Sequence, residues 1–422
     1  MAKDYFTLEA LPARYGDCLL LHYGSDQSPG LALIDGGPSK VWGPFLKPRL
    51  TALRAKRGAG FKIDMLMVSH IDDDHVLGIN DFLAAWKADS TAGRQWPFPV
   101  RQAWFNSFER ISNAKTLDAV TASVTASTGA ASLDEVDLDR PEIANPSRDE
   151  ARAGLKVLAS VRNGKTLRDG LQALNVPTNI GFDGDLVRPG EGPSIPFKLG
   201  PTVTLHVVGP LPNELTKLQA KFAKELKPED ALAAYTDESV PNLSSISVLA
   251  RAGVHSMLLT GDARGDFLLE GLKQEGLLDS AGKLHVDILK MPHHGSDRNV
   301  EKAFFAAVTA DHYVASADGT FGNPDRATLE MLAGARGKQA QYTVHFTYPL
   351  DEIDKRRREE WEKERAVEIS KGKPARPAWN AATDDLRTFR DDRRAAGYKF
   401  DFAAPASTGQ SAKVELMAPI PA

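Results

Sequence analysis

Apolar residues near the N-terminus occur in short runs that have the length of β-strands. Phe6 to Leu11, Cys18 to Tyr23 and Leu31 to Ile34 each read as a strand, and polar turns separate them. The third run ends in Asp35-Gly36-Gly37-Pro38, which is a clear turn signal. We therefore expect a hairpin or meander, followed by a helix over about residues 45–56.

The next segment predicts a buried strand, a polar loop and a helix. Ile63 to Ser69 contains four consecutive apolar residues, which is typical of a strand buried on both faces. The sequence His70-Ile71-Asp72-Asp73-Asp74-His75 follows directly, and apolar residues then recur at helical spacing from Val76 to Trp86. This order places the loop side chains at the carboxyl end of a sheet, where α/β proteins hold their sites.

Strands and helices keep alternating along the rest of the chain. Strands are expected over residues 100–105, 202–208, 245–250, 256–260, 286–291 and 312–316, and helices over residues 148–161, 267–272 and 325–335. The polar stretch from about 109 to 196 has a weaker pattern, and we interpret it as an insertion. Residues 213–238 read as a charged helical excursion, and residues 351–368 as a solvated charged helix. The pattern predicts an α/β catalytic domain over residues 1–350 and a charged C-terminal extension, 351–422, that packs on it or trails from it.

Composition excludes several classes of protein. The chain has 422 residues, of which 42 % are hydrophobic and 26 % charged, as in an ordinary globular enzyme. A formal net charge of −4 gives no reason for strong nonspecific nucleic-acid binding, although it does not exclude a local basic patch. The single cysteine, Cys18, excludes an intrachain disulfide and a cysteine-based zinc cluster. The N-terminus lacks the features of a signal peptide and no apolar run is long enough to span a membrane, so we expect a cytoplasmic chain without membrane association.

The loop after the predicted buried strand carries candidate metal ligands. His70, Asp72, Asp74 and His75 lie within six residues, and alternate loop residues can point to the same side. The alternative is an acidic loop that only caps a helix. Two of the ten histidines in the chain flank the aspartates, which favours metal binding over this alternative. Asp73 is expected to turn away.

Two later strand ends carry further candidates. Asp262 follows Gly261 at the end of a predicted strand, where a tight turn would project its carboxylate. Pro292-His293-His294-Gly295-Ser296 follows another strand. Side chains of adjacent residues diverge in an extended loop, so we expect one histidine to bind metal and the other to orient it or to contact substrate. The alternative is that both histidines pack or are solvated.

Together these motifs resemble the metallo-β-lactamase superfamily, and most closely the branch that includes the nuclease domain of the competence protein ComEC. The resemblance rests on Asp35-Gly36-Gly37, Ser69 to His75, Leu259 to Asp262 and His293 to Ser296, in this order, and covers about residues 5–335. It implies a four-layer αβ/βα sandwich with insertions, and two divalent metal ions, zinc or manganese, in a cleft at one edge of the two sheets.

The resemblance also implies roles for individual residues. His70 and Asp72 would bind one ion, Asp74 and His75 the other, and Asp262 would bridge both. We assign His293 as the remaining ligand and His294 as a catalytic residue beside Asp74 and Asp262, while the choice between the two histidines stays open. The residues expected to support the ligands from behind are Asp35, Ser296 and Asn323.

Two positions depart from the usual motifs. Asp72 stands where the commoner superfamily motif has histidine, and the ComEC-like branch often has aspartate there. Asn323, in Gly322-Asn323-Pro324-Asp325, stands where relatives often have histidine. Asn323 suits a helix cap with Pro324 at the first helical position.

We therefore expect a metal-dependent hydrolase, namely a phosphodiesterase or nuclease that uses a metal-bridged hydroxide on a nucleic-acid substrate. Lys290, Arg298 and Arg264 are the basic residues nearest the motifs. One alternative is a hydrolase of a small phosphoester or other small molecule. Another is a catalytically weak metal-binding module that binds a protein partner through the insertion or the C-terminal extension. The sequence does not indicate the oligomeric state.

Overall fold

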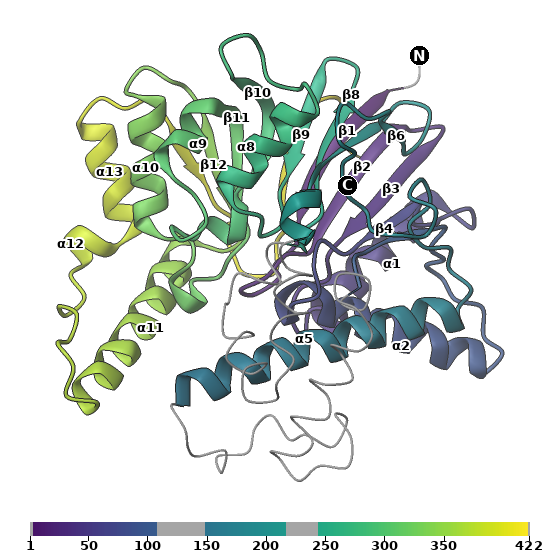
Figure 1. The fold of residues 1–422 in the computed structure, drawn as a ribbon, viewed down its shortest axis with the longest axis horizontal. Helices are drawn as coiled ribbons and strands as arrows, with labels where there is room; N and C mark the ends of the chain where they lie inside the picture. The colour runs from purple at the N-terminus through teal and green to yellow at the C-terminus, as the bar shows by residue number, and fades with distance from the viewer. Residues whose placement is uncertain (1–2, 108–147, 217–243, 421–422) are drawn as a thin grey trace.

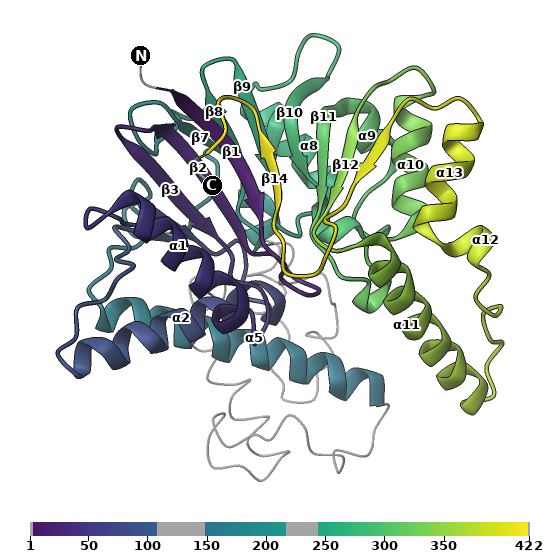
Figure 2. The ribbon, with the colours of Figure 1, turned by 180° about the vertical axis from the view of Figure 1, so that it is seen from behind.

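The computed structural model describes residues 3–107, 148–216 and 244–420 (Figure 1). Residues 109–147 of the expected insertion and residues 217–238 of the expected charged excursion lie outside these ranges. Two β-sheets face each other, and helices cover their outer faces (Figures 1 and 2).

The first sheet is built mainly from the N-terminal part of the chain. In the described residues it has six strands in the order β14-β1-β2-β3-β4-β5. Their bounds are β1 (Asp4–Ala10), β2 (Leu19–Ser25), β3 (Pro29–Ile34), β4 (Met65–Met67), β5 (Ala103–Trp104) and β14 (Ala412–Glu415). β1, β2 and β3 form the predicted antiparallel meander, with Leu20 opposite Leu33, and β3, β4 and β5 run parallel.

The second sheet has eight strands within the described ranges, in the order β13-β12-β11-β10-β9-β8-β7-β6. Their bounds are β6 (Phe197–Lys198), β7 (Thr204–Gly209), β8 (Ser247–Ala252), β9 (His255–Leu259), β10 (Leu284–Lys290), β11 (Val308–Ala315), β12 (Thr343–Phe346) and β13 (Asp401–Ala403). β6 to β9 are antiparallel, whereas β9 to β13 run parallel. The carboxyl ends of β9 and β10 therefore lie side by side at one edge of this sheet.

The helices form the two outer layers. The first sheet is covered by α1 (Lys47–Arg57), α2 (Asp73–Thr91) and α5 (Arg148–Ala173), and the second by α8 (Gly265–Gln274), α9 (Lys302–Ala307), α10 (Arg326–Arg336) and α13 (Leu386–Ala395). The other helices of the described ranges are η1 (Trp42–Leu46), η4 (Pro292–Gly295), η5 (Thr320–Gly322), α11 (Leu350–Ser370) and α12 (Ala381–Asp384). No helix of the described ranges is both long and apolar enough to cross a membrane.

Three hydrophobic clusters hold these layers together. One lies between the first sheet and α1, α2 and α5, and another between the second sheet and α8, α9, α10 and α13. The third fills the space between the two sheets, where Leu21 and Met67 pack with Val248 and Ile288. Apolar burial of this kind is the main favourable term in folding. The predicted α/β class and αβ/βα sandwich are confirmed.

The segment that follows residue 350 is joined to both sheets. β13 pairs in parallel with β12 in the second sheet, and β14 pairs antiparallel with β1 in the first. Figure 2 shows this chain passing from one sheet to the other. Leu386 and Phe389 of α13 are buried in the outer cluster of the second sheet. Residues 351–420 therefore take part in the packing of the sandwich.

A tight glycine contact fixes the loop after β3 against the start of α2. The Gly36 amide donates to the His75 carbonyl (2.7 Å), and the Gly78 amide donates to the Gly37 carbonyl (2.9 Å). A Cβ atom on Gly78 would lie 1.9 Å from the Gly36 carbonyl oxygen. Only glycine at position 78 allows this approach, which sets the position of Asp35 relative to His75.

We predict that Gly78→Ala destabilises the protein, because the added methyl group must push the Gly36 loop away from α2. The expected loss in the free energy of unfolding is roughly 1–3 kcal/mol, measured by urea denaturation. Gly43→Ala is the matched control, since a Cβ there would meet nothing within 4 Å. It should change stability by less than about 1 kcal/mol. Equal effects of the two substitutions would contradict the assigned contact.

Candidate metal centre

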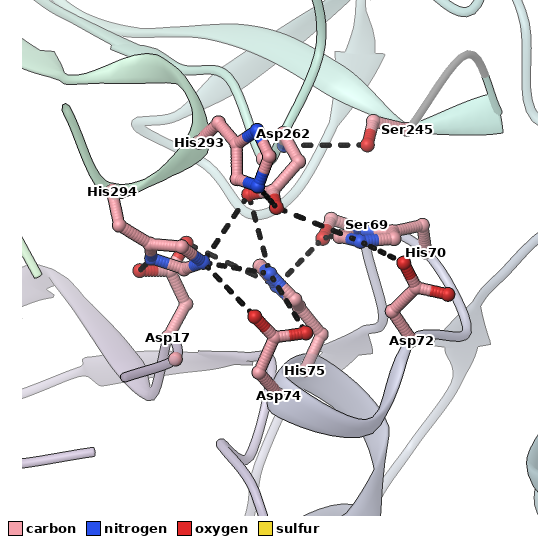
Figure 3. Close-up of polar contacts among 12 residues, drawn as sticks. Asp17, Ser69, His70, Asp72, Asp74, His75, Ser245, Asp262, His293 and His294 are labelled. Carbon is pink, nitrogen blue, oxygen red and sulfur yellow. Dashed lines mark hydrogen bonds and ion pairs between the residues drawn. The ribbon is translucent and has the colours of Figure 1, made fainter. Parts of the chain in front are cut away.

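Side chains from loops far apart in the sequence meet at the carboxyl ends of β4, β9 and β10 (Figure 3). The His70–His75 motif follows β4, Asp262 follows β9, and His293 and His294 follow β10. Ligand atoms of His70, Asp74 and His75 lie within 4.8 Å of one another, and so do those of the second group, Asp17, His75, Asp262 and His294. The fold therefore brings together residues of all three predicted motifs.

Asp262 lies at the centre of the cluster. Its Oδ1 is 3.2 Å from His75 Nε2 and 3.5 Å from His294 Nε2. Its Oδ2 is 3.8 Å from His70 Nε2 and 3.5 Å from His293 Nε2. One carboxylate thus faces four imidazoles, two from each sheet, which is the position expected of a bridging ligand.

The two partly exposed aspartates of the motif face the same cluster. Asp74 Oδ2 lies 3.4 Å from His294 Nε2, and Asp72 Oδ2 lies 3.7 Å from His70 Nε2. Ser160 Oγ donates to Asp72 Oδ1 (2.7 Å), so α5 supports this side of the site. Asp73 is turned away, as expected, and accepts a hydrogen bond from Asn163 Nδ2.

Buried carboxylates stand behind two of the histidines. Asp35 accepts hydrogen bonds from the Ser69 amide and hydroxyl (both 2.7 Å), and its Oδ2 is 2.8 Å from His75 Nδ1. Asp17 Oδ1 is 3.3 Å from His294 Nδ1. In both pairs the carboxylate faces Nδ1 while Nε2 points at Asp262. A carboxylate behind a ligand histidine fixes the ring and its tautomer.

Asp17 is a site residue that the motifs did not predict, and Lys290 has a role that they did not specify. Lys290 Nζ lies 2.5 Å from Asp17 Oδ2, and both side chains are buried. A charged residue in the otherwise apolar end of β10 was the one available signal for Lys290. Asp17 lies in Ala13 to Cys18, a segment that resembles the first hairpin of the ComEC-like branch, but nothing in this segment alone assigns Asp17 to the site.

An unusual backbone turn orients the two adjacent histidines. His293 and His294 have φ angles of 47° and 56°, in the left-handed region. Non-glycine residues adopt this conformation at a cost of about 1–3 kcal/mol each, and they do so mainly at functional sites. The turn differs from the extended loop assumed above, and both imidazoles reach Asp262. The geometry admits either histidine as a ligand, although His294 is fully buried and the His293 side chain is 27 % exposed.

Ser296 and Asn323 lie in the loops that surround this turn. The Ser296 amide donates to the His293 carbonyl (2.8 Å), which closes the turn. Asn323 is nearly buried at the end of η5. The expectation that Asn323 caps the next helix is wrong: α10 begins at Arg326 and its N-cap is Asp325, because the Asp325 amide is held by the Gly295 carbonyl (3.0 Å).

These donors fit a divalent cation. His70 Nε2 and Asp262 Oδ1 are buried and lack hydrogen-bond partners within the described part of the chain. Leaving such atoms unsatisfied is costly. His75 Nε2 and His294 Nε2 also face each other at 3.2 Å. Imidazole nitrogens and carboxylate oxygens pointing at one another are the donor set of zinc and manganese sites.

Electrostatics indicate where protons reside when no cation is bound. Burial lowers the pKa of His294, but Asp262 and Asp17 outweigh this effect and raise it to about 9. The pKa of His75 is raised well above its ordinary value by Asp262, Asp35 and Asp74, against the effect of burial. Burial and the charge of Asp74 raise the pKa of Asp72 to about 7. Protons thus occupy positions that a cation would take.

Residues 14–154 match the family model described as the metallo-beta-lactamase superfamily. This match supports the metallo-beta-lactamase superfamily. The matched range contains Asp17, Asp35 and the His70–His75 motif, and it ends before Asp262 and the paired histidines, which the fold adds to the same site. No curated protein matches the chain. The ComEC-like branch stays a prediction.

Members of the superfamily are generally metal-dependent hydrolases. The match and the histidine–aspartate cluster therefore support a metal-dependent hydrolase with divalent metal ions. Each of the six predicted ligands contacts at least one other side chain of the cluster. These ligands are His70, Asp72, Asp74, His75, Asp262 and His293. Their individual roles as ligands stay predictions.

We predict that Asp35→Asn weakens metal binding by about 10–100-fold, because the amide no longer fixes His75 with a charged acceptor. A competition titration against a chromophoric chelator measures this affinity. Asp89→Asn is the control, since Asp89 lies at the far end of α2 and pairs with Arg94. An unchanged affinity in Asp35→Asn, with the fold intact by circular dichroism, would show that this contact does not support a ligand.

Metal affinity should rise with pH between roughly pH 6 and 9, because His294, His75 and Asp72 must lose their protons to bind. The folded protein holds these protons because the pKa values are about 9 for His294 and about 7 for Asp72, and raised for His75. Calorimetric titration at one neutral pH, in two buffers of different ionisation enthalpy, measures proton release. Identical binding enthalpies in both buffers would exclude it.

Proposed function

We propose that this chain is a metal-dependent phosphodiesterase that acts on nucleic acid. The observation that carries the proposal is the pair of overlapping donor groups that share His75, with Asp262 facing both. Two adjoining groups of this kind suit two divalent ions, the arrangement found in many phosphodiester-cleaving enzymes. The carboxylate-rich donor set and the ComEC-like motifs support a phosphodiester substrate.

The family resemblance supplies a division of the ligands between the two ions. His70 and Asp72 would hold one ion, His75 and Asp74 the other, and Asp262 would contact both, with a histidine of η4 completing the set. When bound, such ions lower the pKa of water so that it becomes a nucleophile, and they stabilise negative charge on the reacting phosphate.

The protein's own groups then orient the reaction. Asp262, His70 and His75 are buried and form a rigid floor, since Asp35 holds His75 from behind. The Asp74 side chain is 22 % exposed, so its carboxylate can contact solvent and is suited to orient an attacking water and accept its proton. Lys290 balances the charge of buried Asp17, which keeps His294 in place.

Metal-stripped protein resupplied with manganese or zinc should hydrolyse bis-p-nitrophenyl phosphate and at least one of single-stranded DNA, double-stranded DNA and RNA. Asp262→Ala and Asp74→Ala should each lower the rate by at least about 100-fold, the upper effect seen for lost outer-shell partners. Asp89→Ala, on the surface of α2, is the control and should keep the wild-type rate.

Three outcomes would change the proposal. Cleavage of the small ester without cleavage of any polymer would favour a small-molecule hydrolase. Two bound metal ions per chain without phosphodiester cleavage would point to another ester or to an amide. Absence of bound metal by elemental analysis, together with unchanged behaviour of Asp262→Ala, would exclude the hydrolase and favour a binding module.

A further inference from the structure

One aromatic side chain projects into solvent close to the metal centre. Phe321, in η5, is 63 % exposed, and within residues 3–107, 148–216 and 244–420 it is the only phenylalanine, tyrosine or tryptophan that is exposed. Its φ angle of 59° lies in the left-handed region, which a phenylalanine adopts only at an energetic cost. Exposing an apolar ring and holding a phenylalanine in this conformation both cost free energy, which points to a functional reason for the residue.

The loop that carries Phe321 is bonded to two sides of the metal centre. Ser316 Oγ donates to the Gly16 carbonyl (2.8 Å), next to Asp17, whose amide donates to the Asp74 carbonyl (3.2 Å). At its other end, the Asp325 amide donates to the carbonyl of Gly295, which directly follows His294. The loop therefore borders both the His70–His75 motif and the histidine turn.

Phe321 contacts a second ring that lies deeper in the structure. Its ring meets that of half-buried Tyr15 edge to face, with centroids 5.2 Å apart and planes at 74°. The Arg14 guanidinium lies 5.2 Å from the Tyr15 centroid, and the Arg14 amide donates to the Tyr348 hydroxyl (2.8 Å). Aromatic rings and a positive charge thus lie together beside the candidate site.

The helix α11 of the C-terminal segment holds the loop from outside. Arg357 Nε donates to the Gly322 carbonyl (3.0 Å), and Arg356 pairs with Asp318. A Cβ on Gly319 would lie only 2.3 Å from the Ile353 carbonyl oxygen, so the loop packs directly on α11. Both flanks of Phe321 are anchored, which makes its ring a preorganised surface and not a loose one.

We propose that Phe321, backed by Tyr15, stacks on an unpaired nucleobase of a single-stranded substrate whose phosphodiester bond reaches the metal centre. The inference rests on the proposed function and specifies its substrate. Every nucleobase presents a flat face to an aromatic ring, so such stacking tolerates any sequence. Bases in a duplex are already stacked and paired. The two rings of Phe321 and Tyr15, which we call the platform, would therefore select single strands over double strands.

Binding to manganese-loaded full-length protein tests the platform without requiring cleavage. The probe is a phosphorothioate oligodeoxynucleotide carrying 2-aminopurine, whose fluorescence falls on stacking. Phe321→Ala should raise the Kd for this strand by about tenfold and lose the quenching, which corresponds to the loss of one stacked base. Phe321→Tyr should retain both. Val254→Ala, at another exposed apolar residue, is the matched control and should bind as wild type.

An abasic strand of the same length separates stacking from phosphate contacts. It should bind wild type and Phe321→Ala equally weakly. The platform is overturned if Phe321→Ala binds the base-bearing strand as tightly as wild type, or if wild type does not distinguish the two strands. If the 2-aminopurine mononucleotide binds and is quenched as strongly as the strand, the ring binds a free nucleotide, and the proposal of a single-stranded substrate is overturned.

Failure of the proposed function can be distinguished from failure of the platform. It would appear as absence of metal-dependent cleavage in wild type, whereas failure of the platform appears only in the Phe321 variants. Thermal unfolding of Phe321→Ala should match wild type because the side chain is mostly in solvent. A large loss of stability would mean that the ring serves the fold.

Discussion

The buried charge of Asp262 is the constraint on which the site and much of the sandwich depend. A carboxylate taken out of water must be compensated, and here the compensation comes from four imidazoles. His70 and His75 follow a strand of the first sheet, whereas His293 and His294 follow a strand of the second. The charge therefore ties the two halves of the sandwich to each other. Burial raises the pKa of Asp262, but His294, His75 and His293 outweigh it and hold the pKa well below its ordinary value.

Acidic and basic groups alternate outward from that carboxylate. Asp35 and His75 lie on one side of Asp262, and the other side continues through His294 and Asp17 to Lys290. The members of this row are buried, so removing any one would leave its neighbour as an uncompensated charge. The row explains why a lysine occupies the end of an apolar strand. It also joins the strand ends of both sheets into one electrostatic unit.

Local patterns predicted most of the elements and the three motifs, because strand and helix periodicity and turn residues are short-range signals. The sequence could not predict contacts that depend on distant pairing. Asp17 gains its role only when the start of β2 and the end of β10 are brought near the same site. β14 likewise pairs with β1 although the two strands are far apart in the sequence. The helix α10 begins within one residue of its predicted start, but its N-cap is Asp325 and not Asn323, and the Asp325 amide is held by the distant Gly295 carbonyl. The left-handed conformation likewise extends from Gly295 to His293 and His294, which are residue types that do not predict it.

The antiparallel pairing of β14 with β1 bears on how the molecule is made. The ribosome makes β1 before β14, so the outer edge of β1 stays without its partner while residues 11–411 are synthesised. An unpaired strand edge is open to pairing with other chains. The nascent chain therefore carries an unpaired strand edge until β14 has been made, and a holdase chaperone that covers residues 4–10 would protect it for that interval.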